Sequence, residues 1–274
     1  MFAKLLKHEW KATAGTLGVF SLAAVGVGVF ATVLLRFVAS FYQQIPDLLW
    51  LPIGTMLGGA VIAIFAYVLG SEIFLVIRFY KNKFTDEGYL TFTLPVTSHQ
   101  IIWSSLINFI GWTVIATVVA GLVIGTALIV GPVKEGFINQ ELLDSLDYWG
   151  YIFERGQWAA EKGFVTYCVM SVLNGIASAL LSVFQIMTAI TLGASIAKKH
   201  KVLASFGIYY GMNVVISAVS SIFSFVIAFA EAETENAYSV LSVTMGIQCV
   251  LYLALCAVAY WIMNGMMQKK LNLP

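Results

Sequence analysis

The feature that most constrains this chain is a set of six long intervals without a single Lys, Arg, Asp, Glu or His. A helix rises 1.5 Å per residue, so about 20 residues cross a hydrocarbon core of about 30 Å, and each interval is at least that long. In hydrocarbon, backbone N–H and C=O groups must pair within the segment, as they do in a helix. Because the intervals are continuously apolar rather than alternating, they argue against a β-barrel. The intervals are residues 12–35, 48–71, 100–133, 163–197, 202–230 and 236–268.

The composition excludes a soluble protein. Hydrophobic residues make up 60% of the 274 and charged residues 11%, against about 45–50% and about 25% in soluble domains. So few charged side chains cannot cover the surface of a soluble chain of this length. We therefore expect an all-α integral membrane protein, with one transmembrane domain over residues 1–274. The first interval is longer than the core of a signal peptide, so we expect it to be retained as a span.

The basic residues alternate from one predicted loop to the next. Eleven of the 15 Lys and Arg residues lie on one side of the membrane in a six-span arrangement, and ten of the 14 acidic residues lie on the other. By the positive-inside bias, both termini are cytoplasmic. The formal net charge of +1 is therefore a cancellation. The eleven basic residues are Lys4, Lys7, Lys11, Arg78, Lys81, Lys83, Lys198, Lys199, Lys201, Lys269 and Lys270.

No motif for catalysis or cofactor binding occurs in the sequence. The histidines, His8, His99 and His200, all lie in basic cytoplasmic segments, and there is no H-E-x-x-H, G-x-S-x-G, C-x-x-C or phosphate-loop pattern. We expect no enzymatic activity, metal site or bound cofactor in this chain. The balanced charge also argues against nucleic-acid binding.

Ion-coupled carriers usually keep an ionisable group near the bilayer midplane, and the predicted spans have none there. Glu72 lies toward the cytoplasmic end of the second span. We expect its carboxylate to reach the interface or to pair with a neighbouring helix.

Uncharged polar side chains within the spans have two interpretations. Most such residues are hydrogen-bond partners between helices, worth about 0.6 kcal/mol each. The alternative is a substrate path, for which Gln185, near the middle of its interval, is the best candidate. Gly54 with Gly58, and Gly121 with Gly125, have the spacing that allows close helix contact. The candidates for a substrate path are Asn108, Asn174, Gln185 and Asn213.

Two further segments have amphipathic patterns. Residues 1–11 place apolar side chains on one helical face and basic side chains on the other, which predicts an interfacial helix that orients the first span. The apolar face consists of Phe2, Leu5, Leu6 and Trp10. Residues 134–162 repeat apolar side chains every three or four positions and predict an external amphipathic helix. This external helix either lies on the outer membrane surface or covers the exit of a transport path.

The predicted cytoplasmic segment 78–99 has an unusually varied sequence pattern for a connection between two spans. A basic start is followed by an acidic pair and an apolar series, and Pro95 ends the run. This pattern predicts a short amphipathic helix beginning near Thr85. An apolar face on such a helix requires a protein or membrane surface to cover it.

Two motifs in this segment resemble permease subunits of type-two ABC exporters. They are Glu87-Gly88-Tyr89-Leu90 and Leu94-Pro95-Val96-Thr97, and the run from Arg78 to Thr97 is especially similar to permeases of Gram-positive bacteria. The basic N-terminal helix and the six spans extend the resemblance over the whole chain in outline. Many members have Thr and Glu after the Gly, where this chain has Tyr89 and Thr91.

The resemblance implies that residues 78–99 are a coupling segment docked on a separate subunit that binds ATP and Mg. It also implies pairing with a second permease, identical or related, among the lipids of a bacterial plasma membrane, and export of a peptide, antibiotic or lipid-like substrate. The alternatives are a membrane scaffold or sensor that holds a cytoplasmic partner, and an ion-coupled carrier. The residues expected to bind the ATP-binding subunit are Lys81, Lys83, Asp86, Glu87, Gly88, Tyr89, Leu90, Leu94 and Pro95.

Overall fold

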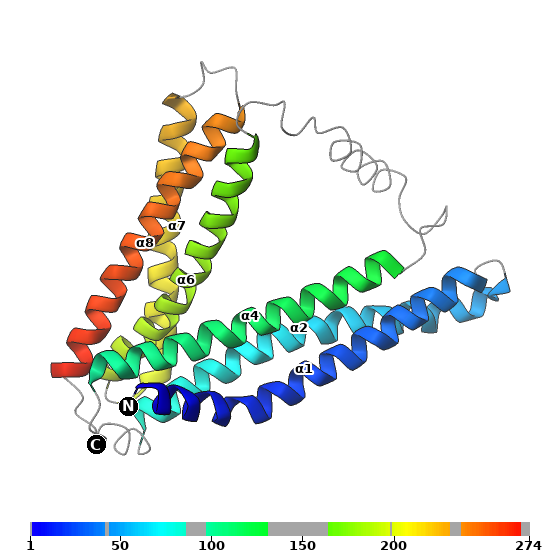
Figure 1. The fold of residues 1–274 in the computed structure, drawn as a ribbon, viewed down its shortest axis with the longest axis horizontal. Helices are drawn as coiled ribbons and strands as arrows, with labels where there is room; N and C mark the ends of the chain where they lie inside the picture. The colour runs from blue at the N-terminus through cyan, green and yellow to red at the C-terminus, as the bar shows by residue number, and fades with distance from the viewer. Residues whose placement is uncertain are drawn as a thin grey trace. The chain divides into compact units, whose positions relative to one another are not determined.

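Long α-helices make up nearly all of the part of this chain that the structure describes. The computed structural model describes residues 2–41, 44–85, 97–130, 164–197, 199–230 and 237–269. Six helices in this part of the chain are long and apolar enough to cross a membrane, which confirms that the six uncharged intervals form long apolar helices. They are α1 (Phe2–Phe41), α2 (Asp47–Phe84), α4 (Ser98–Val130), α6 (Phe164–Ile196), α7 (Lys201–Ala230) and α8 (Ala237–Lys269) (Figure 1).

The helices are longer than a bilayer requires. With 40 and 38 residues, α1 and α2 each extend about 60 Å at 1.5 Å per residue. They must therefore tilt or project beyond the hydrocarbon. Residues 2–11 continue into the rest of α1 as one helix, with Lys4, Lys7 and Lys11 exposed and Leu6 half-buried. The position of residues 1–11 at a membrane surface, and the cytoplasmic side of both termini, stay predictions.

Hydroxyl side chains within the helices bond mainly to their own backbone. Thr32 Oγ1 donates to the Gly28 carbonyl at 2.9 Å, and Thr191 Oγ1 donates to the Met187 carbonyl at 2.8 Å. This bond to the previous turn satisfies a hydroxyl without another helix, which matters because an unpaired polar group in an apolar medium is costly. Serine and threonine are thus compatible with apolar spans.

By internal contacts the chain divides into two compact units, one of Met1–Arg78 with Trp103–Leu146 and one of Phe79–Ile102 with Asp147–Pro274. The first unit contains α1 and most of α2 and α4. Its buried residues Ala24, Tyr67 and Ala116 pack together, and the hydroxyls of Ser21 and Tyr67 are hydrogen-bonded at 2.9 Å. Small residues allow the three helices to approach at this point. The single transmembrane domain over residues 1–274 stays a prediction.

In the second unit, α6 is the central helix. It packs against both α7 and α8 (Figure 1), and 56% of its most apolar stretch is buried, against 6% for α7 and 11% for α8. The outer faces of α7 and α8 expose large apolar side chains such as Phe206, Val215 and Val250. Exposed apolar surface of this extent is typical of helices that contact lipid or another membrane subunit.

Glycine marks close helix contacts, but not at the positions that the sequence spacing predicts. Gly54, Gly58, Gly121 and Gly125 have no atom within 4 Å of the place where a Cβ would stand, so their spacing marks no contact within the described chain. Close approaches occur instead at Gly28 and Gly111, which meet side chains, and at Gly193 of α6, where a Cβ would collide with the backbone of Ser205 in α7. Spacing alone does not say which face of a helix meets a neighbour.

We predict that Gly193→Ala destabilises the protein by about 1–3 kcal/mol, because the added methyl meets Ser205 backbone atoms that cannot rotate away. Gly175→Ala, in the same helix with open space around it, is the matched control. Its greater helix propensity makes it neutral or stabilising by up to about 1 kcal/mol. Thermal unfolding of the two purified variants checks this, and equal melting temperatures contradict the Gly193 contact.

Candidate functional site

The described part of the predicted partner-binding segment is the end of α2. Lys81 and Lys83 lie in its last turn; Lys81 is exposed, whereas Lys83 is buried with 2% of its surface accessible. Thr85 Oγ1 donates to the Lys81 carbonyl at 2.6 Å and so satisfies one of the carbonyls at the helix end. Asp86, Glu87, Gly88, Tyr89, Leu90, Leu94 and Pro95 lie outside the described residues, as do the motif partners up to Val96 and the external segment 134–162.

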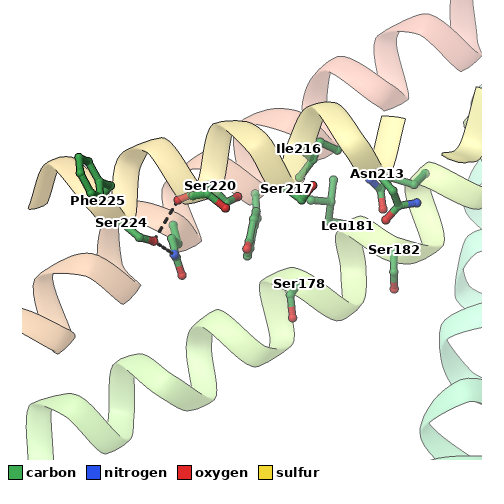
Figure 2. Close-up of a pocket in the computed structure, with 13 residues that line it drawn as sticks. Ser178, Leu181, Ser182, Asn213, Ile216, Ser217, Ser220, Ser224 and Phe225 are labelled. Carbon is green, nitrogen blue, oxygen red and sulfur yellow. Dashed lines mark hydrogen bonds between the residues drawn. The ribbon is translucent and has the colours of Figure 1, made fainter. Parts of the chain in front are cut away.

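A polar groove lies between α6, α7 and α8 in the second unit (Figure 2). Its volume is about 800 Å³, and none of the described side chains that line it is charged. Hydroxyl and amide groups dominate the lining, with Leu181, Ile216 and Phe225 between them. The polar lining residues are Ser178, Ser182, Gln185, Asn213, Ser217, Ser220, Ser221, Ser224, Gln248 and Tyr252.

Helical periodicity brings these polar residues together. On α7, Ser217, Ser220, Ser221 and Ser224 recur at intervals of three and four, so they share one face. The same spacing relates Ser178, Ser182 and Gln185 on α6, and Gln248 and Tyr252 on α8. Three polar faces therefore converge within a bundle whose other faces are apolar. The serine spacing of α7 is a sequence signal that the search for single amide residues missed.

One end of the groove is held by a hydrogen-bond chain across the three helices. Asn174 Nδ2 of α6 donates to Gln248 Oε1 of α8 at 3.4 Å, and Gln248 Nε2 donates to Ser224 Oγ of α7 at 2.9 Å. Ser224 Oγ donates in turn to the Ser220 carbonyl at 2.9 Å (Figure 2). Gln248 thus joins all three helices, which fixes the width of the groove at this level.

Two buried polar atoms near the Asn174–Gln248–Ser224 hydrogen bonds have unused hydrogen-bonding capacity. Among the described residues, the buried Ser220 Oγ and Asn174 Oδ1 have no hydrogen-bond partner. A hydroxyl can donate and accept, and an amide oxygen accepts. Buried polar atoms are normally paired, so these two favour a groove whose occupant is a polar solute or water.

The four predicted substrate-path residues separate into two groups. Gln185, which is 4% exposed, and Asn213 both line the groove, although Asn213 Nδ2 also donates to the Tyr209 carbonyl of its own helix at 3.0 Å. Asn174 adjoins the groove through Gln248. Asn108 belongs to the first unit, where its Oδ1 accepts from Thr13 Oγ1 at 3.1 Å, as in the helix-pairing interpretation.

A second polar cluster joins α1 and α4 in the first unit. Ser105 Oγ donates to Glu9 Oε1 at 3.1 Å, and Glu9 is only 7% exposed. Beside it, Trp10 stacks on Trp112 with ring centroids 5.3 Å apart. Glu9 is not among the residues that the sequence pattern predicts for a site. Its signal is helical spacing, which puts Glu9 on the apolar face four residues after Leu5.

Glu72 pairs with a neighbouring helix, as the sequence predicts. Thr113 Oγ1 of α4 donates to Glu72 Oε1 at 2.8 Å. Within the described residues no group of three or more His, Cys, Asp or Glu side chains could hold a metal ion. The carboxylates of Glu9 and Glu72 therefore belong to no metal-ligand cluster among the described residues. Comparisons with protein families, with curated proteins and with solved structures find no match to this chain.

We predict that the groove is accessible to water. In a chain whose cysteines at 168, 249 and 256 are replaced by alanine, Ser217→Cys should react with a charged, membrane-impermeant thiol reagent about tenfold faster than Val215→Cys. The reason is that thiolate forms in water and is disfavoured in apolar surroundings. Val215 lies on the same helix and is 62% exposed, but it does not line the groove. Equal labelling rates contradict an aqueous groove.

Proposed function

We propose that this chain is the permease subunit of an ABC exporter in a bacterial plasma membrane. The groove between α6, α7 and α8 forms part of its substrate path. Both termini face the cytoplasm, a separate subunit hydrolyses ATP, and a second permease, identical or related, completes the pathway.

The observation that carries this proposal is the uncharged polar groove within helices long enough to span a membrane. Small-molecule sites are typically 300–1,000 Å³ and combine apolar walls with a few polar groups, and a groove of about 800 Å³ is in this range. Hydroxyls and amides facing lipid would be costly, so their gathering on three facing helices favours a polar passage. The mixed lining suits an amphiphilic substrate without net charge, such as a peptide, an antibiotic or a lipid-like molecule.

The uncharged lining of the groove favours a transport step whose energy does not come from an ion bound there. Among the residues that the structure describes, no charged side chain lines the groove, so a proton or sodium ion has no carboxylate to neutralise in this lining. An export step against a gradient then needs another source of energy. The resemblance to the docking segment of ABC permeases indicates that this source is an ATP-binding partner. The motifs that carry it are Glu87-Gly88-Tyr89-Leu90 and Leu94-Pro95-Val96-Thr97.

A physical connection leads from this segment toward the groove. The segment joins the end of α2 at Phe84 to the start of α4 at Ser98. Next to Ser98, His99 is hydrogen-bonded through Nδ1 to the hydroxyl of Tyr260 in α8. Since α8 also contributes Gln248 and Tyr252 to the groove, a displacement of the docked segment would be transmitted to one wall of the path. Coupling then requires that α8 has two positions that the docked segment favours differently.

We predict that Glu87→Lys or Leu90→Asp abolishes assembly with the ATP-binding subunit, because each puts an unfavourable charge into the docking segment. The chain should still insert and reach wild-type levels in the membrane. Lys4→Glu, an exposed charge reversal on α1, is the control and should leave assembly intact. Co-purification from native membranes measures the effect; unchanged assembly in both docking variants contradicts the proposed role of this segment, and capture of a kinase or a cell-wall enzyme favours the scaffold alternative.

We predict that Gln185→Leu lowers ATP-dependent transport at least about tenfold, since it removes a polar contact from the groove. Assembly with the ATP-binding subunit should be unaffected. Gln268→Leu removes an exposed amide of α8 outside the groove, and transport should persist in this control. Substrate uptake into inverted vesicles measures both. Equal transport by the Gln185 variant and the control would remove the groove from the substrate path.

A further inference from the structure

Besides the polar groove, the second unit contains a cavity at the point where α6 is joined to α7. Its volume is about 630 Å³, and Tyr80 near the end of α2 forms one wall. The opposite wall comes from the connection and the first two turns of α7. These lining residues are Lys199, His200, Lys201, Val202, Leu203 and Phe206.

The cavity is basic, and no acid balances it among the described residues of this unit. Lys199, His200 and Lys201 are consecutive, with Lys199 and His200 exposed. The described parts of the second unit, 79–85, 97–102, 164–197, 199–230 and 237–269, contain no Asp or Glu. Two ammonium groups and an imidazole around one cavity favour an anion, and phosphate is the anion that lysine binds commonly.

The rest of the lining is apolar and open to the surroundings. Val202, Leu203 and Phe206 are 65%, 70% and 68% exposed, and they follow directly after the basic run. They lie at the start of a span that runs from Lys201 to Phe225. One cavity thus has a cationic part at the end of a span and an apolar part that begins the span.

We propose that this cavity binds the phosphate of an anionic phospholipid through Lys199 and Lys201, with the acyl chains lying along Val202, Leu203 and Phe206. Basic pockets at the ends of membrane helices suit such head groups. The assignment to the cytoplasmic leaflet rests on the topology proposed above, whereas the site itself does not depend on the exporter function.

The chemistry of phosphate alone fits a free anion as well as a head group. The apolar residues favour the lipid. A free phosphate gains no binding energy from Leu203 and Phe206, whereas acyl chains bury these side chains. Tyr80 adds an amphipathic side chain, of the kind enriched at membrane interfaces. A lipid in this position would contact both α2 and α7, so it would tie the helix that precedes the coupling segment to a helix of the groove.

The test measures phosphatidylglycerol binding to the full chain in nanodiscs of phosphatidylcholine, by native mass spectrometry and by thermal shift. Lys199→Gln with Lys201→Gln should weaken phosphatidylglycerol binding about 20-fold, and Lys199→Arg with Lys201→Arg should retain it. Lys4→Gln with Lys7→Gln removes the same charge from exposed positions of α1 and should change binding less than about twofold. If the double glutamine variant does not fold, each single glutamine variant should still lose about fivefold.

Three results would overturn the proposal. The first is binding unchanged by loss of both lysines, and the second is an equal loss in the α1 control, which would indicate diffuse surface charge. The third is inorganic phosphate at millimolar concentration displacing phosphatidylglycerol, which would make the site one for free phosphate. Assembly with the ATP-binding subunit is scored separately, so failure of the lipid site and failure of the exporter proposal are distinguishable.

Discussion

Hydrogen bonding without water is the constraint on which the rest of this structure depends. In hydrocarbon each backbone polar group must be paired within its own helix, and this gives the six long helices. The same demand applies to side chains, so Thr32 and Thr191 bond to their own backbone and Asn174, Gln248 and Ser224 bond across three helices. Among the described residues, two of the buried side-chain atoms that escape this pairing, Ser220 Oγ and Asn174 Oδ1, adjoin the groove. The candidate site is therefore a local exception to the rule that shapes the fold.

The absence of charge predicts the helices well but predicts their contacts poorly. Each uncharged interval contains most of one helix, because burying a charge in hydrocarbon costs far more than any local preference. The helices α1 and α2 extend well beyond their intervals, to Phe2 at the start of α1 and to Phe84 at the end of α2. Contacts depend on which face meets a neighbour. The spacing of Gly121 and Gly125 pointed to a contact that the described chain does not make, whereas Gly193 meets Ser205 through the tight connection of α6 to α7.

The site was predictable only in part for the same reason. Gln185 and Asn213 were selected because amides are rare in spans, and both line the groove. The serines of α7 were passed over, because serine satisfies itself in a helix and carries little information singly. Their meaning comes from recurrence on one face and from the facing residues of α6 and α8. Glu9 is hard to predict because a charged residue in an amphipathic helix is expected on the face opposite the apolar one. In the structure, contact with α4 buries this carboxylate instead.

In the proposed function, this chain moves a solute with energy from a separate ATP-binding subunit. The most direct measurement is transport into inverted native vesicles, with ATP or an imposed ion gradient as the alternative energy source. We predict uptake that requires ATP, persists when proton and sodium gradients are collapsed, and is lost when the phosphate-loop lysine of the co-purifying subunit is replaced. Uptake that follows a proton or sodium gradient without ATP would contradict it.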